Sequence, residues 1–259
     1  MIQAAEFFQA PVVHIAEPGG DAALFEVELE LPGLAGRCAP GQYFLVRVGE
    51  GVDPLLRRVF LLAGASREGV VLQHHASSPA EAERLRALLQ SSWQLDAFGP
   101  HGTAFAVDDA RDALIAASGV GVAAAAFLAT RHLLAGRAVR LLVPEEMAEA
   151  AQSLVEAVGD EGILVAHFDL PLEGPALEAR LAAEFASAPG HAAYAAGPRA
   201  LVDAFAAAAA RHDGPAQVCL TDSTISCGFG MCLACVVDTP AGRRRICTEG
   251  LVFDAAAFR

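Results

Sequence analysis

Four cysteines near the end of the chain form the pattern that most restricts what this sequence can fold into. Cys227, Cys232 and Cys235 stand within nine residues, and Cys247 follows after eleven intervening residues. The spacing C-x4-C-x2-C…C is the plant-type arrangement of four thiolates around a [2Fe–2S] cluster. Two glycines inside the loop allow the backbone to turn tightly, because glycine adopts dihedral angles closed to other residues. The pattern predicts these four cysteines as metal ligands and one-electron transfer as their chemistry.

Two other uses of the four cysteines remain open at this point. A structural zinc site is commonly built from two short C-x2–4-C pairs, whereas here three cysteines crowd one loop and the fourth stands alone. A disulfide framework is typical of small secreted domains, and this chain is large and begins without the features of a secretory signal. The remaining two, Cys38 and Cys219, are expected to be small buried apolar residues.

Composition argues against several classes of partner. The chain has 259 residues, 54% of them hydrophobic, and 18 basic against 31 acidic residues give a formal net charge of −13. No basic run is present, so we expect neither nucleic-acid binding nor attachment to an anionic membrane surface. Residues 113–130 carry no charge and reach the length of a membrane span, but they are rich in alanine and glycine. A buried strand, a turn and a helix explain this stretch better, which predicts a soluble, cytoplasmic protein without a membrane segment.

The pattern of elements divides the chain into three parts, an α+β multidomain arrangement. Residues 1–108 read as an antiparallel β-barrel with a helical insertion, residues 109–214 as a doubly wound α/β domain, and residues 215–259 as a small cluster-bearing module. In the barrel we predict strands at 24–30, 43–48, 59–62 and 70–73 and a helix at 78–90, with a break at 98–103. In the α/β part we predict strands at 113–117, 138–143, 163–166 and 191–195 and helices at 123–135, 145–158, 176–188 and 199–211.

Two glycine-containing turns lie at the carboxyl ends of predicted strands in the α/β part. Gly119 and Gly121 follow the first strand, and Gly197 and Pro198 follow the last. In an open α/β sheet, ligands gather at this edge, and a glycine turn lets a phosphate approach backbone N–H groups at the start of a helix. The two turns are therefore candidates for one nucleotide site, although the first alone is a weak signal, with a tight turn without a ligand as the alternative.

Two arginines stand beside a strand of the predicted barrel, in the sequence Leu55-Leu-Arg-Arg-Val-Phe60. A guanidinium binds a pyrophosphate through paired hydrogen bonds, and the adjoining strand can present its backbone to a flavin ring. The alternative is a pair of solvated surface charges.

The order of these motifs resembles, over nearly the whole chain, the electron-transfer subunits of the B-type dihydroorotate dehydrogenases, within the ferredoxin reductase superfamily. The cysteine block and the Val-Phe ending are the most specific parts. The matching segments are Pro40–Phe44, Leu55–Arg58, Phe98–Gly102, Gly119–Val122, Ala196–Pro198, Cys227–Cys235 and Cys247–Phe253.

The resemblance implies three cofactors, namely a [2Fe–2S] cluster, FAD in the barrel, and NAD(H) as substrate at the α/β domain. It implies a partner, the FMN-containing catalytic subunit of dihydroorotate dehydrogenase, in a heterotetramer that serves pyrimidine (UMP) biosynthesis. The FAD residues carried over are Arg58, Val59, Phe60, Leu61, His74, His75, Ser77 and Ser78. Those carried over for the nicotinamide nucleotide are Gly119, Gly121, Gly197 and Pro198.

The sequence departs from the family pattern at named positions. Arg58-Val-Phe-Leu61 replaces Arg-Pro-x-Ser, and Ser77 and Ser78 are the only hydroxyls near the place of a Gly-Thr pair. In the α/β part, Ala123-Ala124 replaces Pro-Pro, and Ala196 replaces a cysteine. These departures keep two further hypotheses open. One is a reductase for another acceptor, such as an oxygenase, hydrogenase or sulfur reductase; the other is a cluster-bearing interaction or redox-sensing subunit with degenerate FAD and NAD sites. No catalytic triad or carboxylate pair is found, so no catalytic side chain is predicted.

Overall fold

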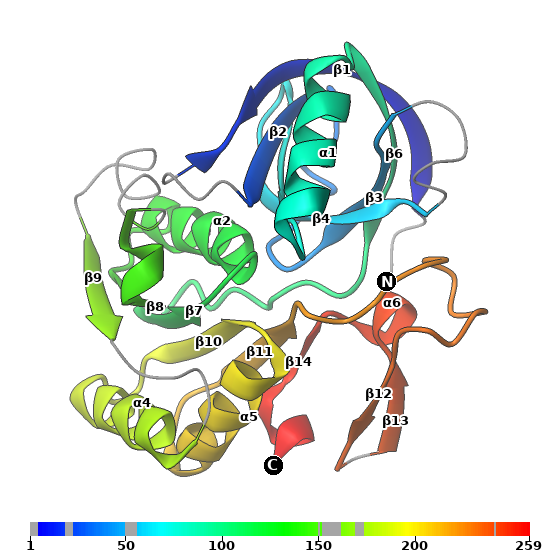
Figure 1. Ribbon diagram of the computed structural model, residues 1–259. Helices are drawn as coiled ribbons and strands as arrows, with labels where there is room; N and C mark the ends of the chain where they lie inside the picture. The colour runs from blue at the N-terminus through cyan, green and yellow to red at the C-terminus, as the bar shows by residue number, and fades with distance from the viewer. Residues whose placement is uncertain are drawn as a thin grey trace.

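A closed barrel, a parallel sheet flanked by helices, and a cysteine-bearing segment follow one another along the chain (Figure 1). The computed structural model describes residues 5–18, 23–49, 56–149, 151, 162–168, 174–240 and 242–259. This architecture confirms the predicted fold class, with the barrel and the α/β part placed in the predicted order.

The barrel closes in the order β1-β2-β5-β4-β3-β6, with every neighbouring pair antiparallel. Alternate side chains such as Phe25, Val27 and Leu29 point inward and are buried, which is the two-residue period of a strand with one face in the core. The break predicted at 98–103 is wrong, because the last strand continues to His101 and pairs with strands on both of its sides. The strands are β1 (Glu6–Ala16), β2 (Leu24–Glu30), β3 (Tyr43–Arg47), β4 (Arg58–Ala65), β5 (Gly69–His75) and β6 (Gln94–His101).

One helix, α1 (Pro79–Gln90), packs on the barrel where the sequence predicted an insertion. It begins at Ser78, whose hydroxyl accepts a hydrogen bond from the N–H of Glu81, and Pro79 occupies the first turn, where no N–H is needed. Its buried side chains, Leu85 and Leu89 among them, face the barrel. The helix therefore presents its N-terminal end at the rim of the barrel, next to the end of β5.

The α/β part is a six-stranded sheet in the order β14-β11-β10-β7-β8-β9. All neighbouring pairs are parallel except β11 with β14. Two of its strands, β11 and β14, flank the cysteines in sequence, so the sheet extends beyond position 214; the predicted domain boundaries stay predictions. The strands are β7 (Ala113–Ala117), β8 (Val139–Pro144), β9 (Ile163–Phe168), β10 (Ala192–Gly197), β11 (Ala216–Leu220) and β14 (Val252–Asp254).

Helices cover both faces of this sheet (Figure 1). The helix predicted at 145–158 starts with a 3-10 turn at Glu145–Met147, and most of its remainder lies outside the described residues. The helices are α2 (Gly121–Leu134), α4 (Pro175–Ser187) and α5 (Arg199–Ala208), with 3-10 turns at Glu145–Met147, Ala209–Arg211 and Ala255–Phe258.

The uncharged stretch 113–130 becomes β7, a turn and most of α2, as predicted. All five residues of β7 are buried, and α2 lies between the sheet and strand β4 of the barrel. A helix covered on several sides is apolar around most of its circumference, which explains the lack of charge. Within the described residues, no helix combines the length and the apolar character that a membrane crossing needs.

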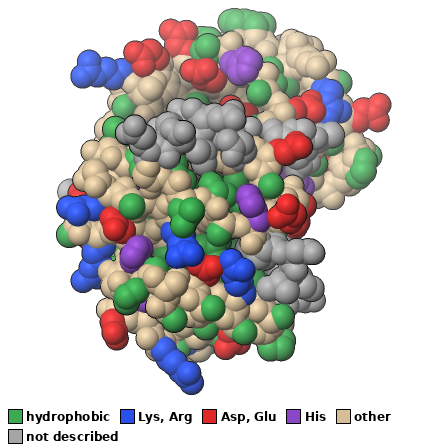
Figure 2. Space-filling view, turned by 90° about the vertical axis from the view of Figure 1, so that its left-hand side faces the viewer, with side chains coloured by type: hydrophobic (Ala, Val, Ile, Leu, Met, Phe, Trp, Pro, Cys, Tyr) green, Lys and Arg blue, Asp and Glu red, His purple; other side chains and the backbone are tan. Residues whose placement is uncertain are grey.

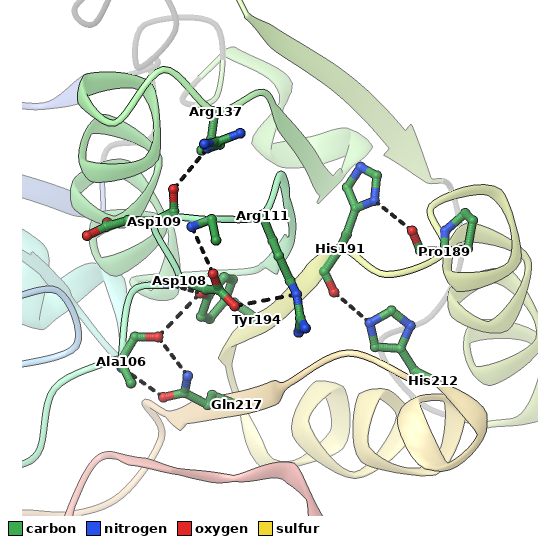
Figure 3. A network of polar contacts seen from close by, with 11 residues as sticks. Ala106, Asp108, Asp109, Arg111, Arg137, Pro189, His191, Tyr194, His212 and Gln217 are labelled. Carbon is green, nitrogen blue, oxygen red and sulfur yellow. Dashed lines mark hydrogen bonds and ion pairs between the residues drawn. The ribbon is translucent and has the colours of Figure 1, made fainter.

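The connection between the barrel and the sheet is held in place by polar contacts (Figure 3). The backbone of Ala106 exchanges two hydrogen bonds of 2.9 Å with the side-chain amide of Gln217 on β11. The hydroxyl of Tyr194 on β10 accepts from the N–H of Asp108 at 3.1 Å, and Arg137 donates to the carbonyl of Asp109 at 2.9 Å. These bonds attach the connection to strands β10 and β11 and to Arg137, which precedes β8, and so restrict how the barrel sits on the α/β part.

Charged side chains of both signs lie on the face of the molecule drawn in Figure 2. Figure 2 shows one face, on which basic and acidic side chains are scattered among each other and do not gather into a basic patch. Several arginines pair with carboxylates, including Arg37 with Glu6 and Arg86 with Glu17.

Candidate functional site

The four predicted ligands come together in one region beside the barrel. Three lie on the segment that leaves β11, and Cys247 lies on the short helix α6 (Ile246–Glu249), after the hairpin β12 (Val236–Thr239) and β13 (Gly242–Arg245). The N–H of Ile246 donates to the carbonyl of Cys235 at 3.1 Å and brings the two parts together.

The thiols form two pairs. The sulfurs of Cys235 and Cys247 are 3.2 Å apart, and Cys227 contacts the thiol and the backbone N–H of Cys232. In a [2Fe–2S] cluster held by four thiolates each iron takes two of them, so two pairs suit the two irons. In the described part of the chain, no three His, Cys, Asp or Glu side chains converge as a site for a single metal ion.

Backbone amides stabilise negative charge on the sulfurs. Hydrogen bonds from the N–H groups of Cys232, Phe229 and Met231 outweigh the opposing effect of burial and lower the pKa of Cys227 to about 6. Burial and the neighbouring Cys235 thiol raise the pKa of Cys247, although the N–H of Gly230 works in the opposite direction. A bound metal replaces the thiol protons, and the same N–H groups can then donate to ligated sulfurs. The donor set fits an iron–sulfur cluster.

Gly228 shows why the cysteine segment needs a glycine at its closest approach to the barrel. Its φ is +75°, and a Cβ would lie 2.8 Å from Leu45 and 3.3 Å from the ring of His101. A side chain would be strained in this conformation and would also push the segment away from the barrel.

Aromatic side chains connect the cysteine segment to strands β3 and β6. The ring of Phe98 lies 5.1 Å from that of Phe229 and 4.3 Å from that of His101, which in turn stacks on Tyr43 at 5.2 Å. The hydroxyl of Tyr43 donates to the carbonyl of Cys247 at 3.3 Å. The cluster region therefore rests on a packed wall of the barrel.

We expect His101 to make stability depend on pH. Burial lowers its pKa to about 4, from an ordinary value of 6.5, because the neutral ring is favoured in the fold. Its contribution to stability is complete above pH 6.5 and is lost as the pH falls toward 4, since the unfolded chain binds the proton first. Between about pH 7 and pH 5 the wild type should lose about 1–2 kcal/mol more than His101→Phe, measured by urea unfolding. Equal losses in the two proteins would refute the assignment.

A cleft of about 370 Å³ opens between the barrel, the first turn of the α/β part and the segment that leads to the cysteines. Most of the predicted FAD residues line it, together with Leu56 and Arg57 of the Leu-Leu-Arg-Arg motif and with residues that the sequence had not assigned to the flavin. The predicted ones are Arg58, Val59, Leu61, His74, His75 and Ser77, and the others are Leu56, Arg57, Glu81, Val120, Thr221, Asp222, Ser223, Thr224, Ile225, Ser226 and Leu251.

Two of the predicted FAD residues do not line this cleft. Phe60 is fully buried in the barrel, because side chains alternate along β4 and its neighbours Val59 and Leu61 take the outward positions. Ser78 caps helix α1.

Both arginines of the barrel motif are engaged in ion pairs. Arg57 holds Asp96 through two nitrogens at 2.9 and 2.7 Å, and its guanidinium lies over the ring of Phe7. Arg58 donates from Nε to Glu81 at 2.8 Å. The interpretation as solvated surface charges is thus inaccurate, since the side chains of both pairs are 19–29% exposed.

Two buried polar atoms in the cleft have no partner within the described chain. His74 uses Nδ1 toward the carbonyl of Val59 at 2.8 Å, and its Nε2 is left without a hydrogen bond; the hydroxyl of Ser223 is the second such atom. Burial lowers the pKa of His74, which favours the neutral ring. Buried polar atoms are normally satisfied, so these two indicate a polar ligand, and the heteroatom edge of a flavin ring suits them.

The two predicted glycine turns meet at the edge of the sheet. The N–H of Ser118 donates to the carbonyl of Ala196 at 3.0 Å, and Val120 lines the cleft described above. Gly119 has φ +56° with open space where a Cβ would stand, whereas a Cβ on Gly121 would lie 2.1 Å from the carbonyl oxygen of Ala196. Gly119 thus leaves room for a ligand, and Gly121 allows helix α2 to approach β10 closely.

Pro198, at the second turn, lines a separate hollow of about 770 Å³ with Arg199, Asp203 and Asp222. Arg199 donates to both carboxylates: its side-chain Nε donates to Asp203, and its backbone N–H donates to Asp222. The assignment of Gly119, Gly121, Gly197 and Pro198 to a nicotinamide nucleotide stays a prediction.

Sequence comparison finds a family match over the region that holds the four cysteines. Residues 222–259 match the family model described as the iron–sulfur cluster binding domain of dihydroorotate dehydrogenase B. The electron transfer subunit of dihydroorotate dehydrogenase B (NAD(+)) from Bacillus cereus strain Q1 is 24% identical over 239 residues, covering 83% of this chain and 84% of the relative. The subunit from Bacillus anthracis strain CDC 684 / NRRL 3495 gives the same identity and coverage.

Solved structures share the fold at low identity. The NADH-dependent reduced ferredoxin–NADP oxidoreductase superposes with a TM-score of 0.76 at 18% identity, covering 96% of this chain and 89% of that one. Phthalate dioxygenase reductase, described as a modular structure for electron transfer from pyridine nucleotides to [2Fe–2S], gives 0.59 at 14% identity, with 97% and 96% covered.

Fold and family match thus support the predicted cofactor set of [2Fe–2S], FAD and NAD(H). The chain thus shares the fold of these reductases, and its residues 222–259 match the model of an iron–sulfur cluster binding domain.

Proposed function

We propose that this chain is the electron-transfer subunit of a cytoplasmic dihydroorotate dehydrogenase of the B type, which passes electrons from an FMN-containing catalytic subunit to NAD+ in pyrimidine biosynthesis. The names of the relatives and the match over residues 222–259 support this proposal. The observation that carries it is the continuity of the two sites: residues 221–226 line the cleft, and the chain then runs directly into Cys227.

Each part of the chain has a role in this scheme. The two thiol pairs would hold the cluster, and the cleft residues Arg58, His74 and Ser77 would hold and orient the flavin. Bound FAD supplies the exchange between single electrons and the hydride that a nicotinamide accepts. The barrel wall and the segment 221–226 keep the two cofactor sites adjacent.

The surface around Cys232 suits contact with a partner protein. Cys232 is exposed, and the neighbouring Phe229, Met231 and Leu233 are 55%, 83% and 60% exposed. Apolar side chains gathered on a surface commonly mark a contact site for another protein. A heterotetramer with the catalytic subunit would cover these side chains and bring the cluster close to the FMN.

The test is co-expression with the catalytic subunit, followed by anaerobic purification and addition of dihydroorotate. We expect the chains to co-purify, the visible absorption of the cluster to bleach on addition of dihydroorotate, and NADH to form when NAD+ is supplied. If the chains do not associate and only NADH reduces the cluster, the alternative applies, a reductase for another acceptor. The likeness in fold to phthalate dioxygenase reductase is the observation that favours this alternative.

Arg58→Ala should weaken FAD binding by about tenfold, because it removes a guanidinium that can form charge-assisted bonds to phosphate. The measurement is titration of the flavin-free protein with FAD, followed by quenching of flavin fluorescence. Arg243→Ala is the matched control, since the side chain of Arg243 on β13 is 81% exposed and does not line the cleft. FAD affinity that is equal in all three proteins would remove Arg58 from the flavin site.

A further inference from the structure

The carboxylate of Glu81 occupies the point where the cleft offers its strongest donors for an anion. Arg58 donates to it from Nε at 2.8 Å, and Ser77 donates from both its backbone N–H at 2.9 Å and its hydroxyl at 2.5 Å. All three residues line the same cleft. One side chain of the protein therefore takes up donors that come from β4 and from the loop before α1.

These donors are those that commonly bind a phosphate group. A guanidinium forms charge-assisted hydrogen bonds to phosphate oxygens, and N–H groups at the start of a helix, aided by the helix dipole, favour a negative charge. Helix α1 is 12 residues long, and Ser77 precedes its capping residue Ser78. An anionic ligand part at this end of the cleft would need the donors that Glu81 already holds.

Among the described residues that line the cleft, Arg58 is the arginine whose guanidinium could bind a phosphate once Glu81 is displaced. Arg57, the other arginine of the lining, is bound through two nitrogens to Asp96. The ion pair of Arg58 and Glu81 is partly buried, with side chains 29% and 19% exposed, so water screens it less than a pair on the open surface.

Glu81 carries its charge at neutral pH. Burial raises the pKa of its carboxyl, but the hydrogen bonds from Ser77 and the charge of Arg58 outweigh burial, and the net pKa lies below the usual value. The negative charge is therefore present whenever the cleft is empty of a competing anion.

We propose that Glu81 competes with the phosphates of the flavin dinucleotide for Arg58 and Ser77, and thereby sets how strongly the cleft discriminates between phosphorylated and unphosphorylated flavins. This inference rests on the proposed function, in which the cleft holds the flavin. In the wild type, FAD binds only by displacing the carboxylate, so part of the affinity that its phosphates would provide is lost. Riboflavin has the same ring and no phosphate, and its binding does not require the displacement.

The experiment compares flavin-free, full-length wild type with Glu81→Gln. The glutamine keeps the size of the side chain and the backbone N–H that donates to Ser78, so the helix cap is retained. Affinities for FAD and for riboflavin are measured by quenching of flavin fluorescence, and thermal unfolding checks the fold. We expect Glu81→Gln to bind FAD about tenfold more tightly, because the freed donors can meet phosphate oxygens. Its affinity for riboflavin should change by less than about twofold.

Two further variants sharpen the result. Glu83→Gln is the matched control, since Glu83 is an exposed carboxylate on the same helix and lies outside the cleft; both flavin affinities should stay at the wild-type values. Glu81→Ala removes the carboxylate without leaving an amide, and it should also favour FAD over riboflavin relative to the wild type.

Three outcomes would overturn the inference. FAD affinity that is unchanged or weaker in both Glu81 variants means that Glu81 does not compete with phosphate. An equal gain for FAD and riboflavin means that the effect does not act through phosphate. Absence of binding for both flavins in every protein refutes the flavin role itself, and with it this inference; the first two outcomes leave that role intact.

Discussion

Cys232→Ser is expected to lose the iron–sulfur spectrum, with a fall in bound iron and in the broad visible absorption after anaerobic purification. A serine hydroxyl is a poor replacement for a thiolate at iron, and Cys232 forms one of the two thiol pairs with Cys227. The barrel should stay folded, because Cys232 is exposed on the cysteine segment and is not part of the core. Circular dichroism measured on the same sample checks the fold.

The control is a cysteine of the same region that the spacing does not include. Cys219→Ala changes a fully buried residue of β11 that lies eight positions before Cys227. Burial raises the pKa of the Cys219 thiol to about 12. It should keep the cluster and lose about 1 kcal/mol of stability through the small cavity. A normal cluster in Cys232→Ser, or its loss in Cys219→Ala, would contradict the ligand assignment.

The second large effect is expected at the closest contact between helix α2 and strand β10. A Cβ on Gly121 would lie 2.1 Å from the carbonyl oxygen of Ala196 and 2.4 Å from its carbon, and both are backbone atoms that cannot rotate away. Gly121→Ala must therefore move the helix or the strand, and we expect a loss of about 3 kcal/mol. The loss should appear as a fall in Tm of about 6 °C or more in thermal unfolding.

Gly119→Ala separates this clash from the general cost of replacing a glycine. Gly119, unlike Gly121, has a positive φ of +56°, but a Cβ there would meet no atom within 4 Å. Only backbone strain of about 1 kcal/mol is then expected, so its Tm should fall clearly less than that of Gly121→Ala. Equal losses in the two variants would show that the approach of α2 to Ala196 is not what requires a glycine at 121.

The parts of the molecule that the sequence predicted are those in which the physical signal is local. The spacing of the cysteines predicts three metal ligands on one loop and a fourth further along the chain. The apolar character of residues 113–117 predicts a strand, and this strand is buried on both faces. The capping residue Ser78 and the following proline mark the start of α1 directly in the sequence. Such features involve residues within a few positions of each other.

The cleft was predicted only in part. Arg58 was predicted from the Leu-Leu-Arg-Arg motif, and His74 and Ser77 from the family resemblance. The lining residues Thr221–Ser226 gave no signal, because they enter the cleft only after β11 has joined the sheet. Phe60 was assigned to the flavin as a member of its motif, although the two-residue period of β4 turns it into the barrel while its neighbours face the cleft. Ser78, assigned with Ser77, caps helix α1 and does not line the cleft.

The four cysteines as predicted cluster ligands, the order of the barrel and the α/β part, and the two glycine turns could all be read from the sequence, because each depends on spacing or periodicity along the chain. The fold was needed to show that the thiols form two pairs, that the cysteine segment rests on Tyr43, Phe98 and His101, and that Glu81 takes up the donors of Arg58 and Ser77. These contacts join residues that lie on different strands and loops. Such residues come within bonding distance only when the chain folds and packs, so a pattern of neighbouring residues in the sequence does not reveal them.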